Sequence, residues 1–224
     1  PRQATRPLDR FHGTTTRASL TYEQDLGAWS VFDNSKFSWT NFSTDSERNF
    51  IVGMRRSAAE TWRSDLPPQL LQSAPRGFKV YGTQPQFSLH VDGPVTQQWT
   101  VGARAVREDI DFLVGNTSLD NGVYTLVRDW QFRDRAWAAY VSDAIGFADD
   151  RLVVTPGVRY EHLDATYRNR ANGTSFTNNV RNALPGLTVG FKASDRWYVY
   201  ADAQRSLRAP QVTQIVFGDN LDSE

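Results

Sequence analysis

The feature that most constrains the fold of this chain is a two-residue periodicity that recurs along it. Residues 197–204 show it clearly: Trp197, Val199 and Ala201 alternate with tyrosines and an aspartate. Successive side chains of a strand point to opposite faces, so the alternation predicts strands with one apolar and one polar face. About eight segments carry it, with strands of roughly ten residues or more, the length that crosses a bilayer when tilted. They centre on residues 17–23, 29–39, 87–91, 99–105, 137–145, 152–161, 187–191 and 197–204.

The connections between these segments are of two kinds. Tight turns are predicted around Gly27, Asp92-Gly93, Ala148-Asp149 and Ser194-Asp195. Long polar or irregular stretches fill residues 45–80, 108–135 and 167–183. A soluble sandwich shows a turn signal every 8–12 residues, whereas tight turns recur here only after roughly fifty. Short turns on one side and long loops on the other are typical of outer-membrane barrels. We therefore predict an all-β fold of about eight antiparallel strands forming part of a transmembrane β-barrel.

The polar side of the alternation supports a water-filled interior. Arg104, Arg159, Glu161 and Asp202 all fall on it. A soluble core does not bury that many charges, but a wide barrel lumen accommodates them. Only 39% of the residues are hydrophobic and no apolar run approaches 18 residues, which excludes a transmembrane helix.

Two further residue types bear on the strands. Trp29, Trp99 and Trp197 each follow a tight turn by a few residues. This placement favours an aromatic girdle at a membrane interface, the alternative being ordinary core aromatics of a soluble β protein. Pro156 lacks an amide donor, so we place it at a bulge or irregularity of its strand.

Several function classes find no support in the sequence. The 25 basic and 25 acidic residues cancel, which argues against a nucleic-acid partner. There is no cysteine, so disulfides and thiolate chemistry are excluded. His12, His90 and His162 lack metal-ligand spacing, and no catalytic constellation is present. The carboxylates within residues 107–111 are interpreted as a solvated strand end, with a calcium site as the alternative. We expect neither an enzyme nor a resident cofactor.

Four segments resemble a known family. They are LVVTPGVRYEHLD (152–164), LPGLTVGFKASDRWYVYADAQRSLRAPQ (184–211), DRFHGTTTRASLTYE (9–23) and RAWAAYVSDAI (135–145). Together they resemble the mid-barrel of TonB-dependent outer-membrane siderophore receptors, and most closely the ferric citrate receptor group. The likeness spans most of the chain, and the loops match least.

The resemblance implies a 22-stranded barrel in the outer membrane of a Gram-negative bacterium, with long extracellular loops and short periplasmic turns. In this family an N-terminal plug closes the barrel, and the TonB complex drives import of a ferric siderophore or related metal chelate. The chain starts without methionine and stops in the polar stretch GDNLDSE. We expect residues 1–224 to be a partial barrel domain, with the plug and the C-terminal strands absent and outer-membrane lipid around it.

The resemblance also implies which residues meet the ligand. Chelates of the citrate class are anionic, and the planar fork of arginine suits carboxylates. By motif, Arg55 or Arg56 in GMRR, Arg76 in PRGF and Arg128 in VRD take the places of ligand-contacting arginines in the family. Gln211 and Gln214 in APQVTQI match strand-end glutamines that face the ligand chamber. For each arginine the alternative is a solvated loop charge.

Two other functions stay open on the sequence alone. One is a passive porin-like channel or adhesin barrel without TonB coupling. The other is a soluble, secreted carbohydrate-binding β protein that uses exposed aromatic side chains. A plug domain with a TonB-contacting segment would separate the first from the receptor, and solubility without detergent would support the second.

Overall fold

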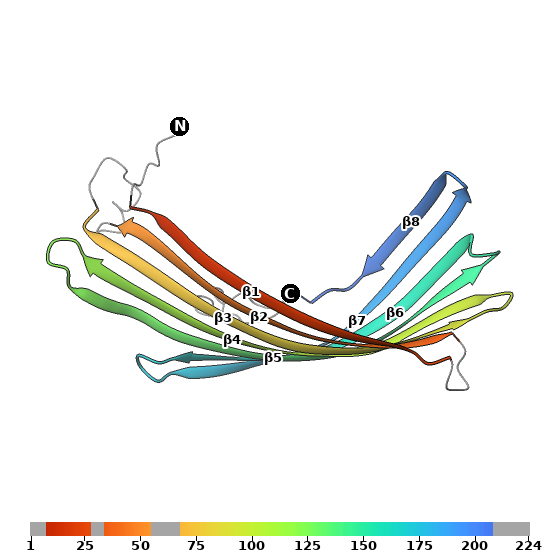
Figure 1. Cartoon of the computed structure of the whole chain (residues 1–224), viewed down its shortest axis with the longest axis horizontal. Helices are drawn as coiled ribbons and strands as arrows, with labels where there is room; N and C mark the ends of the chain where they lie inside the picture. Colours follow the sequence, from red (N-terminus) through yellow and green to blue (C-terminus); the bar gives the residue numbers. More distant parts are fainter. Residues whose placement is uncertain (1–7, 28–33, 55–67, 208–224) are drawn as a thin grey trace.

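The computed structural model describes residues 8–27, 34–54 and 68–207, which form one curved sheet of eight antiparallel strands in sequence order (Figure 1). The strands are β1 (Arg10–Asp25), β2 (Ser35–Met54), β3 (Leu70–Val91), β4 (Thr96–Ser118), β5 (Tyr124–Phe147), β6 (Leu152–Asn169), β7 (Ser175–Ser194) and β8 (Trp197–Gln204). The predicted all-β class and the strand count are confirmed. No helix among the described residues is long and apolar enough to cross a membrane.

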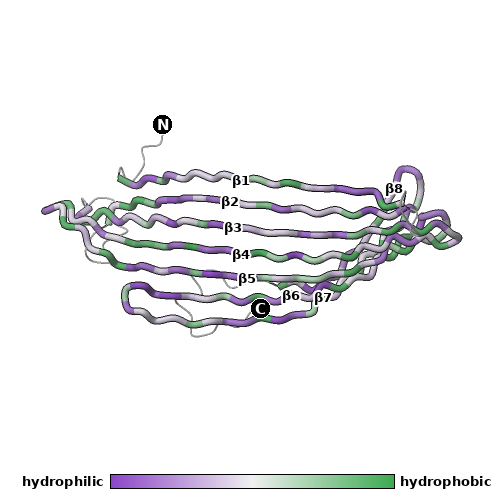
Figure 2. Tube along the Cα trace, turned by 60° about the horizontal axis from the view of Figure 1, so that its bottom comes forward, coloured by the Kyte–Doolittle hydropathy of each residue, from purple (hydrophilic) through white to green (hydrophobic). Residues whose placement is uncertain are grey.

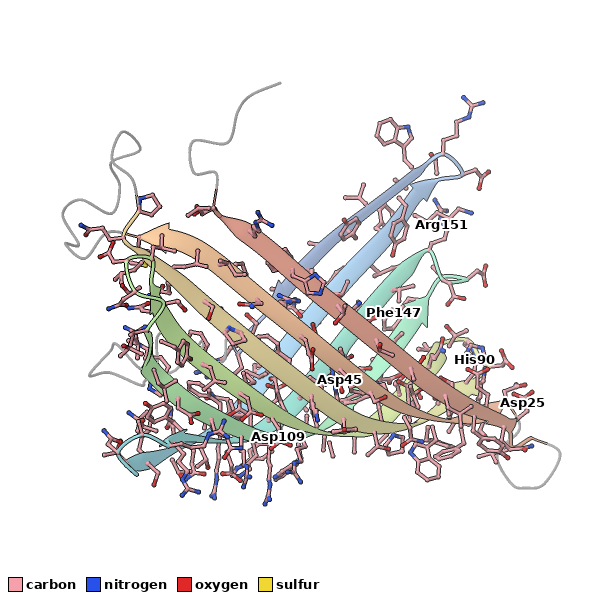
Figure 3. All side chains as sticks on the ribbon, turned by 60° about the vertical axis from the view of Figure 1, so that its left-hand side comes forward. Asp25, Asp45, His90, Asp109, Phe147 and Arg151 are labelled. Atoms are coloured by element: carbon pink, nitrogen blue, oxygen red, sulfur yellow. The ribbon has the colours of Figure 1, made fainter. Side chains whose placement is uncertain are left out.

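The hairpin connections gather at two ends of the sheet. We call turn end the side of residues 92–95, 148–151 and 195–196, and distal end the side of residues 119–123 and 170–174. At the turn end, Ala148, Asp149 and Asp150 all have positive φ, at 55°, 56° and 60°. Aspartate tolerates this left-handed region, whereas alanine is strained there. Figure 3 shows Asp25, His90 and Arg151 at the turn end.

The strands are much longer than the sequence predicted, and this corrects the expected loops. Most of residues 45–80, 108–135 and 167–183 lies in strands, because β3, β4 and β5 have 22, 23 and 24 residues. The physical reason is that both faces of these stretches carry polar groups, so the contrast between the faces that reveals a strand is weak. Trp29 and Val31 of the predicted second segment lie outside the described residues.

The register assigns each residue to one of two faces. Directly opposed residues of an antiparallel pair share a face, so the pairing carries the assignment from strand to strand. One face, which we call the band face, carries most of the apolar side chains that the sequence pattern identified. They are Leu20, Tyr22, Phe37, Trp39, Phe87, Leu89, Trp99, Val101, Ala103, Ala105, Trp137, Ala139, Val141, Val154, Val158, Tyr160, Leu187, Val189, Phe191, Val199 and Ala201. The opposite side is the polar face. Figure 2 shows hydrophobic and hydrophilic residues alternating along the strands.

Part-way along the strands, the apolar side chains change from the band face to the polar face. On the band face of β4, Ala105 is followed by Arg107 and Asp109, while the polar face at the same level takes up Ile110 and Phe112. At about 3.3 Å per residue, strands of this length far exceed a tilted crossing of an apolar band about 25 Å tall. The apolar band therefore occupies the turn-end half of the sheet, and the distal half extends beyond it.

Pro156 lies at an interruption of the β5–β6 ladder, as the sequence predicted. Ser142 pairs with Gly157 and Ile145 pairs with Val154, and the residues between these pairs have no partners in that register. The missing amide of the proline thus coincides with a gap where no donor is required.

Candidate ligand-binding site

The distal half of the polar face carries a layer of rings and guanidinium groups. We call it the arginine–aromatic wall: Arg48, Phe50, Arg76, Phe78, Phe112, Arg128, Trp130, Phe132, Tyr167 and Phe176. The register explains how six strands build it. Arg48 lies opposite Arg76, Arg76 opposite Phe112, and Phe112 opposite Trp130. These residues come from β2, β3, β4 and β5. The neighbouring row of paired residues, one step closer to the turn end, extends the wall to β7.

The aromatic side chains form a rigid floor. Phe132 is 1% exposed and lies 5.2 Å, between ring centroids, from Tyr167. Tyr167 in turn lies 4.8 Å from Phe176 and 6.0 Å from Trp130. Each such pair contributes about 0.5–1.5 kcal/mol beyond the area it buries. The rings bury one another on a single sheet face, which fixes their positions.

Arg76 is held flat on this floor. Its guanidinium lies 4.3 Å from the ring centroid of Phe112 and 5.3 Å from that of Phe50. Its Nε is buried and has no hydrogen-bond partner among the described residues. Burial, together with the charge of Arg48, lowers the pKa of Arg76. An oriented donor that lacks an acceptor, in a field of two cations, favours an anionic group beside it.

Arg48 and Arg128 flank this residue. The Arg48 guanidinium lies 5.5 Å from the ring of Phe78, and that of Arg128 lies 4.9 Å from the ring of Trp130. Neither Arg48 nor Arg76 is within ion-pair distance of a carboxylate in the part of the chain that the structure describes. Stacked on rings, the guanidinium groups of Arg48 and Arg76 can present their N–H edges to a carboxylate.

The sequence-predicted residues divide into two groups. Arg76 and Arg128 lie on the same wall, but in β3 and β5 rather than in loops as expected. Arg55, Arg56, Gln211 and Gln214 lie outside the described residues. Sequence reasoning grouped Arg48 with the loop charges and gave it no role. The signal that could have found it is the two-residue spacing that places Arg48 on the same face as Ser46 and Phe50 in an extended β2.

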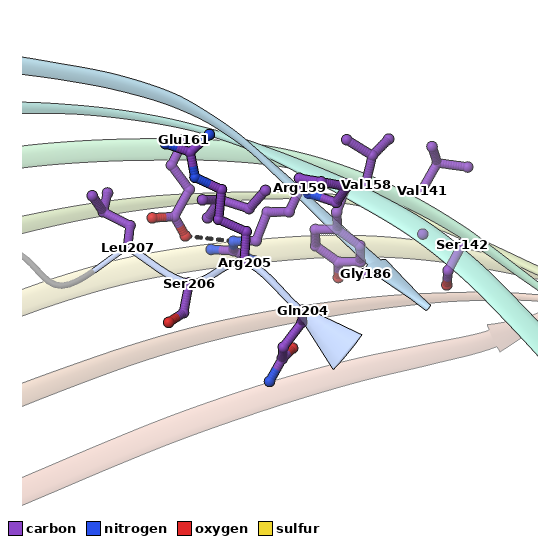
Figure 4. Close-up of a pocket in the computed structure, with 14 residues that line it drawn as sticks. Val141, Ser142, Val158, Arg159, Glu161, Gly186, Gln204, Arg205, Ser206 and Leu207 are labelled. Carbon is purple, nitrogen blue, oxygen red and sulfur yellow. Dashed lines mark hydrogen bonds and ion pairs between the residues drawn. The ribbon is translucent and has the colours of Figure 1, made fainter. Parts of the chain in front are cut away.

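A hollow of about 420 Å³ lies on the polar face where the chain leaves β8 (Figure 4). Arg159 donates to Glu161 there. The hydroxyl of Tyr140 accepts from Gln84 Nε2 at 3.3 Å and donates to Gln86 Oε1 at 3.0 Å. This hydrogen-bonded polar surface suits a water-filled lumen.

Neither the arginine–aromatic wall nor this hollow resembles a protein-built metal centre. Over residues 8–27, 34–54 and 68–207, no group of three or more histidine, cysteine, aspartate or glutamate side chains could hold a metal ion. What the arginine–aromatic wall offers chemically is cationic and planar, and it suits an anion with carboxylate edges.

Comparison with known proteins identifies a family and several solved structures to which this chain is similar. The sequence matches the TonB dependent receptor-like β-barrel family over residues 1–224. The ferric citrate transporter FecA in its unliganded form is 26% identical, with a TM-score of 0.79 over 95% of this chain and 30% of that one.

Two further solved structures share the fold at lower identity. The siderophore receptor PiuA from Acinetobacter baumannii is 14% identical, with a TM-score of 0.68 over 89% of this chain and 33% of that one. The ferric-catecholate import receptor Fiu from E. coli K12 is 15% identical, with a TM-score of 0.63 over 92% and 34%. The chain spans about a third of each of the three structures.

Proposed function

The chain belongs to the TonB dependent receptor-like β-barrel family, and we propose that it is part of the wall of an outer-membrane receptor that imports a ferric siderophore. The family is one of transport receptors. In this proposal the eight strands are about a third of a 22-stranded barrel in a Gram-negative outer membrane. The chain performs no covalent chemistry, and a plug domain elsewhere in the protein couples import to the TonB complex.

The lengths of the connections at the two ends of the sheet support an orientation of the barrel in the membrane. Outer-membrane barrels place short turns in the periplasm and longer loops outside. The turn end, where three of the four connections (92–95, 148–151 and 195–196) have two to four residues, then faces the periplasm. The band face meets lipid, and the polar face lines the lumen. The arginine–aromatic wall thereby opens towards the outside, where a ligand arrives.

The observation that carries the substrate class is the Arg48–Arg76 pair. Two guanidinium groups lie side by side on aromatic rings, and the buried Nε of Arg76 has no acceptor. A chelate rich in carboxylates supplies both the charge and the acceptors. We propose a ferric citrate-like chelate, with iron as cargo. The 26% identity to a ferric citrate transporter supports this choice.

Substitution in the full-length receptor tests the proposal. Arg76→Ala combined with Arg48→Ala should weaken ferric citrate binding at least tenfold, because each charge-assisted hydrogen bond contributes about 1.5–3 kcal/mol. Arg76→Lys should bind with intermediate affinity, since lysine keeps the charge but loses the planar fork. The dissociation constant is measured by tryptophan fluorescence quenching on the purified receptor.

Arg196→Ala is the matched control, because Arg196 lies in the turn between β7 and β8. It should bind like the wild type. Unchanged binding in the Arg48/Arg76 double variant would refute the substrate class. Uptake that continues in cells lacking TonB would instead favour the passive channel.

A further inference from the structure

The turns at residues 119–123 and 170–174 contain the two Asn-Gly pairs of the sequence. Asn121-Gly122 lies between β4 and β5, and Asn172-Gly173 lies between β6 and β7. The two glycines have positive φ values of 72° and 76°, and all four residues are exposed. An asparagine amide reacts readily with the backbone nitrogen of a following glycine, because glycine has no side chain to obstruct the approach. Both turns therefore present a reactive amide to water.

The backbone hydrogen bonds of the two turns correspond one to one. Gly122 N donates to Ser118 O, and Gly173 N donates to Asn169 O, both at 2.9 Å. The backbone nitrogens of Ser118 and Asn169 in turn donate to the carbonyl of the residue after each glycine, at 2.9 and 2.8 Å. The glycine nitrogen, which is the nucleophile of the reaction, is thus held in the same way in both turns.

The two asparagine side chains are held differently. Val123 N donates to Asn121 Oδ1 at 3.1 Å, and Thr174 N donates to Asn172 Oδ1 at 3.0 Å. The Thr174 hydroxyl adds a second hydrogen bond to Asn172 Oδ1, at 2.8 Å, for which valine has no donor. Closing a ring between the amide carbon and the glycine nitrogen reorients the side chain. The extra bond at Asn172 therefore has to be given up before reaction.

The 170–174 turn is also anchored more firmly to the sheet. The backbone nitrogen of Arg170 donates to Asp129 O at 2.8 Å, and its guanidinium pairs with Asp129 and with Asp111. Leu119, the residue in the same place of the other turn, is held through its backbone nitrogen, which donates to Gln69 O at 3.0 Å. A turn that opens less often offers its amide for reaction less often.

We propose that Asn121 is a site of spontaneous deamidation in the folded protein, and that the Thr174 hydroxyl protects Asn172 from the same reaction. The Gly122 nitrogen bonds to Cγ of Asn121, and the side-chain nitrogen leaves as ammonia, taking the proton of the glycine N–H. Water then opens the resulting cyclic imide at either carbonyl, which gives aspartate or isoaspartate. The reaction consumes one water and releases one ammonia, and it needs no oxidant or cofactor.

The product changes the distal end of the molecule. Each event replaces a neutral amide by a carboxylate in a turn beyond the apolar band. Isoaspartate also lengthens the main chain by one carbon inside the hydrogen bond from Ser118 N to Val123 O, and should weaken it. The reaction depends neither on the substrate nor on the orientation proposed above, so its test is independent of the proposed function.

Incubation of the full-length receptor in detergent at pH 8, followed by proteolysis and mass spectrometry, measures the reaction at each asparagine. Asn121 should react at least about twofold faster than Asn172, since one hydrogen bond shifts a local equilibrium by about two- to tenfold. Synthetic peptides of residues 114–127 and 165–178 should react at similar rates, because glycine follows the asparagine in both. Equal rates in the folded receptor, or no reaction at Asn121, would overturn the inference.

Exchanging the residue after each glycine supplies the matched variants. Val123→Thr adds the missing hydroxyl and should slow the reaction at Asn121 severalfold. Thr174→Val removes the hydroxyl and should speed the reaction at Asn172 severalfold, whereas Thr174→Ser keeps it and should react like the wild type. Rates that stay unchanged in both exchanges would refute the role of the hydroxyl. The wild-type comparison stands without any variant, so a variant that fails to fold leaves the proposal open to refutation.

Discussion

At the scale of single residues, the environment of each charge separates the candidate site from a solvated surface. Arg76 lies between two rings and lacks a carboxylate partner, whereas Arg107 and Arg159 are each neutralised two residues along their own strands. A structural role would satisfy the guanidinium within the protein. Under the proposed function, the guanidinium of Arg76, whose Nε has no partner among the described residues, is oriented for a ligand that arrives from solution.

Asp134 is the polar-face group with the most displaced pKa. It lies opposite Glu108, beyond the apolar band on the distal side, and its buried Oδ1 has no hydrogen-bond partner in the part of the chain that the structure describes. Burial, reinforced by the charges of Glu108 and Asp109, raises the pKa of Asp134 to about 6. An unfolded aspartate titrates near 3.9. Between these values the folded state binds more protons, so this group stabilises the fold at low pH and the stabilisation is lost as pH rises through about 6.

Replacing this carboxyl should therefore flatten the pH dependence of stability. In the full-length receptor, Asp134→Asn should raise the unfolding temperature at pH 7.5 by a few degrees at most, and change it less at pH 5. Differential scanning calorimetry at the two pH values measures the difference. Asp149→Asn in the exposed 148–151 turn is the control, since asparagine also accepts its positive φ. Equal pH dependence in Asp134→Asn and wild type would contradict the assignment.

At the scale of strands, three of the four predicted tight turns are confirmed, whereas the connection around Gly27 is longer, at residues 26–34, and the strand lengths were not predicted. Tight turns at 92–95, 148–151 and 195–196 follow local turn chemistry, so they could be located from sequence. Beyond Ala105 the apolar residues lie on the other face of the strand. A search for two-residue periodicity that follows one face therefore ends the strand too early. For the same reason Arg76 and Arg128 were identified by motif but placed in loops. Arg48 was passed over because only the β2–β3 register brings it to Arg76.

Tyr140 lies across the neighbouring strand because a glycine makes room for it. A Cβ added at Gly102 would lie 2.4 Å from Cζ and Oη of Tyr140. Gly102→Val should therefore displace the ring, break its hydrogen bonds to Gln84 and Gln86, and destabilise the barrel by about 1–3 kcal/mol. The temperature at which the folded band of the full-length receptor disappears on a gel measures the effect.

Gly77→Val provides the comparison, since a Cβ at Gly77 meets nothing within 4 Å and φ is not positive there. This change should shift the transition only slightly, by about 0.5 kcal/mol or less, as for other surface substitutions. Equal shifts in the two variants would show that the ring over Gly102 contributes nothing to stability.

At the scale of the whole molecule, the sheet of residues 10–204 has two unpaired edges. Among the described strands β1 pairs only with β2, and β8 pairs only with β7. Unpaired amides and carbonyls are costly in lipid, which admits closed barrels but not open sheets. The edges therefore require further strands of the same barrel.

Residues 1–224 produced alone should accordingly fail to insert as a stable monomeric channel. Semi-native electrophoresis of the refolded chain in detergent should show one mobility before and after boiling. The full-length receptor, run beside it, should show the compact band that disappears on boiling. A heat-sensitive compact band from the isolated chain would contradict the prediction.

On the band face, apolar side chains give way to charged ones between Ala105 and Arg107. In the proposed membrane placement, this change also limits how far the protein can slide along the membrane normal. A shift of two residues along the strands would carry Arg107, Arg133 and Arg135 towards hydrocarbon, at a cost that rises from about 0–1 kcal/mol each near the interface to about 2–4 at mid-depth. A shift the other way would expose the apolar band to water. In the proposed orientation, the strands themselves thus set the immersion depth, and the rings and arginines of the distal half stay at a constant height above the cell surface.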